Sequence, residues 1–218
     1  GIFCPKKMNR GDMDRHTHKS FSKGDYIYMP REHADKVYFV ESGRVKVGHY
    51  SSDGKEITKA ILGEGEVFGE LSLIGEGKRR DFAFAMEDTE LCILSVEDIK
   101  SLMREYTPFS IFMMKILGSR VLTMEKRLES LVFKDSRTRI IEFLLELIDK
   151  KGQRVGYEWL VRKFLTHQEI ANLTATSRQT VTTVLNELRN KDILTFNRRR
   201  LLVRELDQLK AEAEPISN

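Results

Sequence analysis

The chain has 218 residues, enough for one large or two modest domains, and its 37 basic and 33 acidic residues give a formal net charge of +4. Its two cysteines, Cys4 and Cys92, are too few for an iron–sulfur cluster, which needs about four ligands. The sequence shows no secretory segment and no apolar run of about 18 residues, so we expect a cytoplasmic protein with no membrane partner.

The first hundred residues have the pattern of a β domain. Short apolar segments such as 37–40 and 45–47 alternate with glycine-containing turns such as 52–54, at intervals of roughly ten residues. This spacing predicts a β-sandwich or a jelly-roll barrel. His16 and His18 would point to one face of its first strand, where they could share a Zn²⁺ ion. A solvated pair is the commoner arrangement, and we predict no metal site.

The segment Phe68-Gly69-Glu70-Leu71 predicts the start of a short helix within this domain. Backbone N–H groups at such a helix start carry partial positive charge, and Arg80 adds a fixed positive charge. Together they could hold a phosphate, while Glu70 could accept a hydrogen bond from a ribose hydroxyl.

A long helix is expected over residues 106–133, following a short helical segment that begins near Val96. Apolar side chains recur along it at alternating spacings of three and four, which is the heptad pattern of a two-stranded coiled coil. We therefore predict that this helix forms a homodimer through Met114, Leu117, Val121, Met124, Leu128 and Leu131. A second apolar set would pack on the β domain: Phe109, Phe112, Met113 and Ile116.

Residues 134–218 predict a separate domain. Lys134-Asp135-Ser136 reads as a break with a helix cap, and a helix should follow from about Ser136 to Lys150, closed by Gly152. A β-rich segment, 155–165, comes next. A hairpin follows later, with strands at 193–196 and 201–203.

Between these β segments lie two short amphipathic helices joined by a tight turn at Thr174-Ala175-Thr176, the pattern of a helix-turn-helix. Thr166 and Glu169 have the spacing of a capping box, and Ser177 can cap the second helix. The hairpin would then be a wing. Between residues 166 and 204, seven basic residues face three acidic ones, so we predict binding to double-stranded DNA. The predicted DNA contacts are Thr166, Gln168, Ser177, Arg178, Gln179, Thr182, Thr183, Arg198, Arg199 and Arg200.

A β-barrel, a long dimer helix and a winged helix-turn-helix in this order resemble the Crp/Fnr family of transcription regulators, the family of the cAMP receptor protein. The resemblance covers nearly the whole chain. Its most specific marks are Phe68-Gly69-Glu70-Leu71 with Gly77-Lys78-Arg79-Arg80, the strand His16-Thr17-His18-Lys19, and Ser177-Arg178-Gln179-Thr180-Val181. It implies an α+β fold with an effector-sensing cyclic-nucleotide-binding-like domain at 1–105, a dimerisation helix at 106–133 and a DNA-binding domain at 134–218.

The resemblance also implies an effector pocket. Members that bind cAMP use the residues matching Glu70 and Arg80 for ribose and phosphate. Here Asp81 replaces a serine beside the arginine, and its charge would repel a phosphate. Met124-Glu125 replaces the pair that meets adenine, with Thr123 one residue away. The candidate pocket residues are Phe68, Gly69, Glu70, Leu71, Arg79, Arg80, Asp81, Thr123, Met124 and Glu125. The effector stays open between cAMP, another nucleotide or small ligand, haem, and no ligand at all; candidate haem ligands are His16, His18, His33, His49 and the methionines.

In the recognition helix, the resemblance implies that Arg178 contacts a guanine base. Its guanidinium can donate two hydrogen bonds to the O6 and N7 atoms of that base. Gln179 stands where the family often has glutamate, and a glutamine favours adenine. Thr183 stands where the family has a further base-reading arginine, and a threonine can contact a thymine methyl group. Arg198, Arg199 and Arg200 would bind phosphates. Ala175 stands where such turns usually have glycine, at a cost of up to about 1 kcal/mol.

Three alternatives to such a regulator are a nucleotide-binding regulatory module, a haem or gas sensor and an enzyme. A nucleotide-binding regulatory module without DNA function would lack the helix-turn-helix, and a haem or gas sensor of the same family would need an evident axial ligand pair. An enzyme would need a catalytic signature that the chain lacks, so we predict none. The expected partners are DNA, a second copy of the chain and RNA polymerase.

Overall fold

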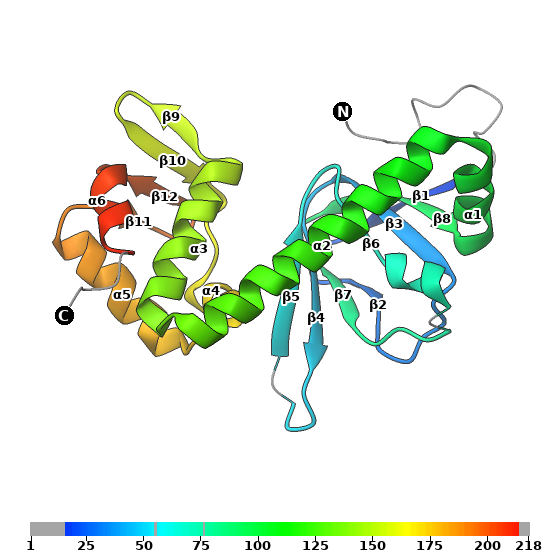
Figure 1. Ribbon diagram of the computed structural model, residues 1–218, viewed down its shortest axis with the longest axis horizontal. Helices are drawn as coiled ribbons and strands as arrows, with labels where there is room; N and C mark the ends of the chain where they lie inside the picture. Colours follow the sequence, from blue (N-terminus) through cyan, green and yellow to red (C-terminus); the bar gives the residue numbers. More distant parts are fainter. Residues whose placement is uncertain (1–15, 55, 76, 214–218) are drawn as a thin grey trace. The chain divides into compact units, whose positions relative to one another are not determined.

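The computed structural model describes residues 16–54, 56–75 and 77–213 (Figure 1). The chain divides into two compact units, residues 1–122 and 123–218, and the long helix α2 contributes to both. Each unit is described by itself.

From residue 16 on, the described part of the first unit contains two four-stranded antiparallel sheets, in the orders β1-β8-β3-β6 and β2-β7-β4-β5. Between β6 and β7 lies a short 3₁₀ helix, η3 (Glu70–Ile74). The strands are β1 (His16–Phe21), β2 (Tyr26–Tyr28), β3 (Lys36–Ser42), β4 (Val45–Tyr50), β5 (Glu56–Leu62), β6 (Val67–Phe68), β7 (Phe82–Ala85) and β8 (Thr89–Ser95).

One apolar core draws on both sheets, with Tyr38, Phe68 and Leu91 from one and Tyr28 and Val45 from the other. Because each strand alternates its side chains between two faces, β3 also contributes Val37 and Phe39 to a second core. Of the sandwich and the jelly-roll barrel that the sequence predicts, the structure has the sandwich. The strands form two separate sheets with an apolar core, as in a jelly-roll sandwich, and not one closed ring of hydrogen bonds.

Helices α1 (Val96–Glu105) and α2 (Thr107–Phe133) close the second core. Phe109 and Met113, on the first turns of α2, are fully buried against this core, as the second apolar set predicted. Cys92 is fully buried in the same core, and Cys4 lies outside the described residues.

Up to residue 213, where its description ends, the second unit has a small sheet in the order β11-β12-β10-β9 and four helices beyond the end of α2. Helix α3 begins after Asp135, whose carboxylate accepts a hydrogen bond from the backbone N–H of Thr138 at 2.7 Å. The elements are α3 (Ser136–Lys151), β9 (Gln153–Val155), β10 (Glu158–Arg162), α4 (His167–Thr174), α5 (Arg178–Asn190), β11 (Leu194–Phe196), β12 (Arg200–Val203) and α6 (Leu206–Ala211). Among the helices described, none is long and apolar enough to cross a membrane.

Candidate DNA-binding surface and effector pocket

Helices α4 and α5 form the helix-turn-helix that the sequence predicts, and both are capped as expected. The hydroxyl of Thr166 accepts from the N–H of Glu169 at 3.2 Å, and the Glu169 carboxylate accepts from the N–H of Thr166 at 2.7 Å. The hydroxyl of Ser177 accepts from the N–H of Thr180 at 3.0 Å. These caps fix where each helix starts and therefore which side chains of its first turn face outward.

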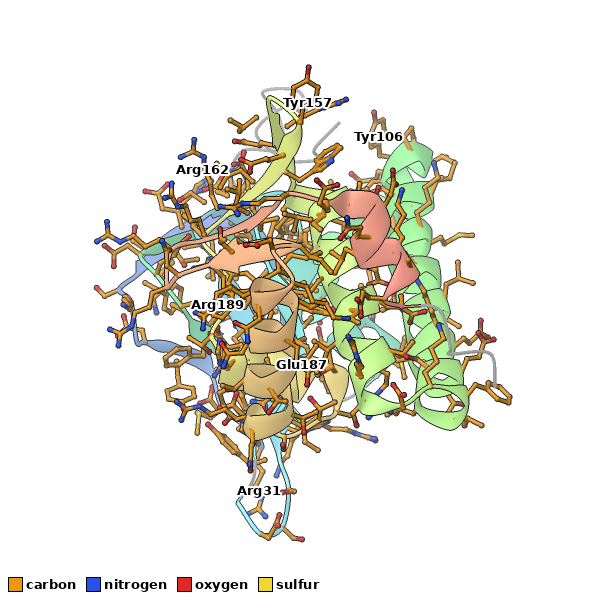
Figure 2. All side chains as sticks on the ribbon, turned by 90° about the vertical axis from the view of Figure 1, so that its left-hand side faces the viewer. Arg31, Tyr106, Tyr157, Arg162, Glu187 and Arg189 are labelled. Carbon is orange, nitrogen blue, oxygen red and sulfur yellow. The ribbon has the colours of Figure 1, made fainter. Side chains whose placement is uncertain are left out.

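The apolar side of this motif is buried, with Ile170 and Ala171 on α4 and Val181 and Leu185 on α5 inaccessible to solvent. The opposite side presents the predicted DNA contacts. The exposed side chains are Thr166, Gln168, Ser177, Arg178, Gln179, Thr183, Arg198, Arg199 and Arg200. Figure 2 views this unit with α5 at the front and Tyr157 at the tip of the β9–β10 hairpin.

Thr182 departs from the expected exposure. It is half-buried, its hydroxyl donates to the backbone carbonyl of Arg178 at 2.9 Å, and it also lies 2.8 Å from Nδ1 of His167. The reason is that α4 packs across this side of α5, so Thr182 joins the two helices.

The wing is held by a local turn. The side-chain oxygen of Asn197 accepts from the backbone N–H groups of Arg199 at 2.8 Å and Arg200 at 3.0 Å. The turn lets Arg198, Arg199 and Arg200 extend into solvent, where they are available to phosphates.

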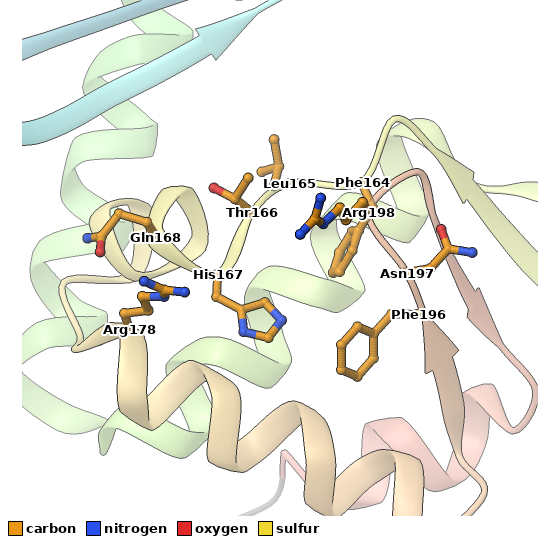
Figure 3. Close-up of a pocket in the computed structure, with 9 residues that line it drawn as sticks. All are labelled: Phe164, Leu165, Thr166, His167, Gln168, Arg178, Phe196, Asn197 and Arg198. Atoms are coloured by element: carbon orange, nitrogen blue, oxygen red, sulfur yellow. The ribbon is translucent and has the colours of Figure 1, made fainter.

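A hollow of about 450 Å³ lies between the start of α4, the start of α5 and the wing (Figure 3). Its apolar lining includes Phe164 and Phe196, and its polar lining includes His167, Arg178 and Arg198. Sequence reasoning missed His167 because a single histidine at a helix start has no spacing signature.

In the first unit, the candidate effector pocket is built around Gly69 and η3. Gly69 has φ 77°, and a Cβ there would lie 2.9 Å from the Arg79 guanidinium and 3.1 Å from the carbonyl oxygen of Lys36. The position therefore needs glycine for both its conformation and its space.

Arg79 is the arginine that lies beside Gly69. It is buried, and it donates to the carbonyl oxygens of Gly69 at 3.1 Å and Lys36 at 2.5 Å. Its guanidinium carbon also sits 4.4 Å from the centre of the Tyr28 ring. Arg80, which the family resemblance matched to the phosphate-binding arginine, is exposed.

The carboxylates of the candidate pocket are engaged by other side chains. Glu70 is buried and forms an ion pair with Arg120 of α2, which also donates to the carbonyl oxygen of Val67. Asp81 pairs with Lys59 at 2.9 Å. Burial, followed by the charge of Asp81, raises the pKa of Tyr28 far above its usual value.

These contacts decide how a cyclic nucleotide fits. The ribose would need Glu70, which already holds Arg120, and the phosphate would meet Asp81. The described side chains therefore do not fit cAMP as they stand. Leu71 is exposed, and Thr123, Met124 and Glu125 lie on the exposed surface of α2 within the second unit.

His16 and His18, the candidate metal-binding pair, have other neighbours. Nδ1 of His18 lies 2.8 Å from a carboxylate oxygen of Glu41, and its ring contacts His16 edge-on. Within residues 16–54, 56–75 and 77–213, no group of three histidine, cysteine, aspartate or glutamate side chains is arranged to hold a metal ion.

Comparison with known proteins matches both units. Residues 18–106 match the cyclic nucleotide-binding domain, and residues 138–212 match the Crp-like helix-turn-helix domain. The chain is 33% identical over 187 residues to a global nitrogen regulator of Nostoc, covering 85% of this chain and 84% of the relative. It is 34% identical over 185 residues to a cyclic AMP receptor protein of Thermus thermophilus, covering 85% and 82%. The chain belongs to the Crp/Fnr family.

A solved structure supports the same assignment. A variant of CooA from Carboxydothermus hydrogenoformans superimposes with a TM-score of 0.83 and 31% identity, covering 95% of this chain and 92% of that one. As a member of the Crp/Fnr family, the protein is a transcription regulator and not an enzyme. It combines a domain of the cyclic nucleotide-binding type with a DNA-binding helix-turn-helix.

Proposed function

We propose that this protein is a homodimeric, effector-responsive transcription regulator that binds a pseudo-palindromic DNA site in the cytoplasm. The observation that carries the proposal is the capped α5 helix, whose first turns expose Arg178, Gln179 and Thr183 on one side while Val181 and Leu185 are buried on the other. A helix anchored in this way can enter the major groove and read base edges.

The dimer is supported by the exposed apolar side of α2. Met114, Met124 and Leu128 are 67%, 69% and 64% exposed, although Phe109 and Met113 on the same helix are buried. A monomer would leave this heptad row in water, and a second copy of the helix would cover it. A two-fold dimer would place two recognition helices on half-sites about one helical turn, roughly 34 Å, apart.

The effector is a separate part of the proposal. The engagement of Glu70 by Arg120 and of Asp81 by Lys59 favours a ligand other than cAMP in the first unit. Haem is less favoured, because His18 already contacts Glu41. RNA polymerase remains the expected protein partner of a DNA-bound dimer.

The test is a selection of binding sites from a random duplex pool, followed by fluorescence anisotropy of the selected duplex at fixed salt with and without cAMP. We expect two inverted half-sites that each contain a guanine, and equal affinity with and without cAMP. A selected sequence without two-fold symmetry would contradict the dimer mode of binding. A large gain in affinity on adding cAMP would contradict our view of the pocket.

A runner-up function is a nucleotide-binding regulatory module that does not bind DNA. It would leave the exposed arginines of α5 and the wing without a role. Anisotropy separates the two functions directly, because DNA binding through phosphates weakens steeply with salt, and the module would show no binding at any salt concentration.

A further inference from the structure

His167 joins three elements of the second unit. It is the first residue of α4, and its ring forms part of the wall of the hollow in Figure 3. Its Nδ1 lies 2.8 Å from the hydroxyl oxygen of Thr182 on α5, and its ring centre lies 5.5 Å from that of Phe196 on the wing. The imidazole is therefore held in one place by the recognition helix and the wing together.

The hydrogen bonds of Thr182 favour one tautomer of the neutral His167 ring. A hydroxyl has one proton, and Thr182 donates it to the carbonyl oxygen of Arg178 at 2.9 Å. With its proton used in this way, the hydroxyl accepts from Nδ1–H of His167, which is the arrangement that satisfies both contacts. In a neutral ring this leaves Nε2 with a lone pair, and no hydrogen-bond partner for Nε2 is found among the described residues.

The charged groups around His167 are mainly positive. Arg178 from α5 and Arg198 from the wing line the same hollow, and the guanidinium carbon of Arg189 lies 5.3 Å from the centre of the Phe196 ring. The nearby carboxylate of Glu169 is used to cap Thr166. Burial, and then the charge of Arg178, lower the pKa of His167 below its ordinary value, so the ring is neutral near pH 7 in the free protein.

A DNA phosphate complements both the hydrogen-bonding groups and the positive charge of this hollow. A phosphodiester oxygen only accepts hydrogen bonds, so it would be repelled by the lone pair of a neutral Nε2 and attracted by a protonated one. Its negative charge would also oppose the field of Arg178 and Arg198, which is the field that disfavours the imidazolium.

Resting on the DNA-binding function proposed above, we propose that His167 binds a backbone phosphate of DNA in this hollow and takes up one proton from solvent as it does so. Nε2–H then donates to a non-bridging phosphate oxygen, while Nδ1–H keeps its hydrogen bond to Thr182. DNA binding is thereby linked to proton binding, one proton for each protomer.

The direction of the pH effect follows from the two states. The pKa of His167 is lowered in the free protein and raised when a phosphate is bound, so between these two values complex formation consumes protons. Affinity therefore falls as pH rises through this interval, by up to about tenfold per pH unit for each protomer. At pH values above the pKa that His167 has in the DNA complex, this residue contributes no further pH dependence to the affinity.

Proton uptake can be measured by isothermal titration calorimetry of the full chain with a selected duplex, near pH 7, in buffers of different ionisation enthalpy. The variants are wild type, His167→Gln and the matched control His49→Gln, which removes a histidine of the first unit. We expect net uptake in wild type and His49→Gln, and its loss in His167→Gln. Equal uptake in all three proteins, or none in wild type, would overturn the inference.

A second measurement does not depend on any variant folding. Nitrogen NMR of labelled histidine side chains, with and without duplex, reports the protonation state of each ring nitrogen. We expect Nε2 of His167 to change from a free nitrogen to a protonated one when DNA is added. A ring that stays neutral in a tight complex would overturn this inference and leave DNA binding intact, whereas absence of any complex would overturn the proposed function.

Discussion

The guanidinium of Arg139 on α3 holds the turn at Ala175. Its Nη2 donates to the carbonyl oxygen of Ala175 at 3.1 Å and its Nε to that of Thr174 at 3.0 Å, while Nη1 donates to that of Lys134 at 2.8 Å. Ala175 has φ 51° and ψ 50°, the left-handed conformation in which glycine is usual. One arginine thus binds the last carbonyls of α4 and stabilises a turn that alanine alone disfavours.

Replacing this arginine should destabilise the DNA-binding unit. Arg139→Met removes hydrogen bonds to three backbone carbonyls, so we expect a loss of about 1–3 kcal/mol in the free energy of unfolding. Trp159 is the one tryptophan of the chain and lies on β10 of this unit. Urea unfolding followed by its fluorescence measures the loss.

Two variants control this experiment. Lys151→Met removes an exposed positive charge from the other end of α3 and should change little. Ala175→Gly removes the conformational penalty and should stabilise the unit by up to about 1 kcal/mol. If Arg139→Met unfolded at the same urea concentration as Lys151→Met, the hydrogen bonds at the turn would contribute nothing measurable.

We expect Arg178 to read a base and Arg198 to bind a phosphate, so their variants should have different effects on DNA binding. Arg178→Ala should cost about 1–3 kcal/mol on the selected duplex and relax the preference at one base pair of each half-site. Arg198→Ala should weaken binding to all duplexes alike and lower the salt dependence by about one unit for each protomer. Anisotropy on the selected duplex and its single-base variants, at several salt concentrations, measures both. Uniform weakening by Arg178→Ala would show that it binds a phosphate only.

The dimer should depend on one side of α2. Met124→Lys places a charge in the heptad row and should convert the dimer to a monomer. Leu122→Lys makes the same kind of change at a residue that is similarly exposed, 67% against 69%, but lies outside the row, and should leave the dimer intact. Light scattering after gel filtration gives the two masses. Dimers in both variants would exclude this row as the interface.

The ion pair of Arg120 and Glu70 should stabilise the first unit. Arg120→Met would leave Glu70, which is 3% exposed, as a buried carboxylate without its ion-pair partner. We expect a loss of about 1–3 kcal/mol in scanning calorimetry, partly recovered when Glu70→Gln is added. Lys115→Met, which removes an exposed charge from the same helix, is the control. Unchanged melting of Arg120→Met would show that the pair contributes no net stability.

Much of this fold could be predicted because its signals are local. The capping box of Thr166 and Glu169 and the cap at Ser177 fixed the helix-turn-helix, since each involves residues three apart. The apolar periodicity of α2 likewise predicted that Phe109 and Met113 would be buried. The choice between a sandwich and a jelly-roll barrel stayed open, because strand spacing says how many strands there are but not which of them share hydrogen bonds.

The candidate pocket was less predictable, because its contacts join residues far apart in sequence. Arg120 pairs with Glu70, 50 residues away, and Lys59 with Asp81, 22 residues away. A signal for Arg120 did exist, since it continues the spacing of Phe109, Met113 and Ile116 along the packed side of α2. A charged residue on an apolar row predicts a buried partner of opposite charge.

The helices, their caps, the apolar row of α2 and the family could all be inferred from the residue order, because they depend on neighbouring residues and on periodicity. The folded structure was needed to show which arginine lies beside Gly69, which carboxylates are already paired, and that Thr182 contacts His167. Burial and hydrogen bonding depend on which surfaces meet, and residues distant in the chain meet only when it folds.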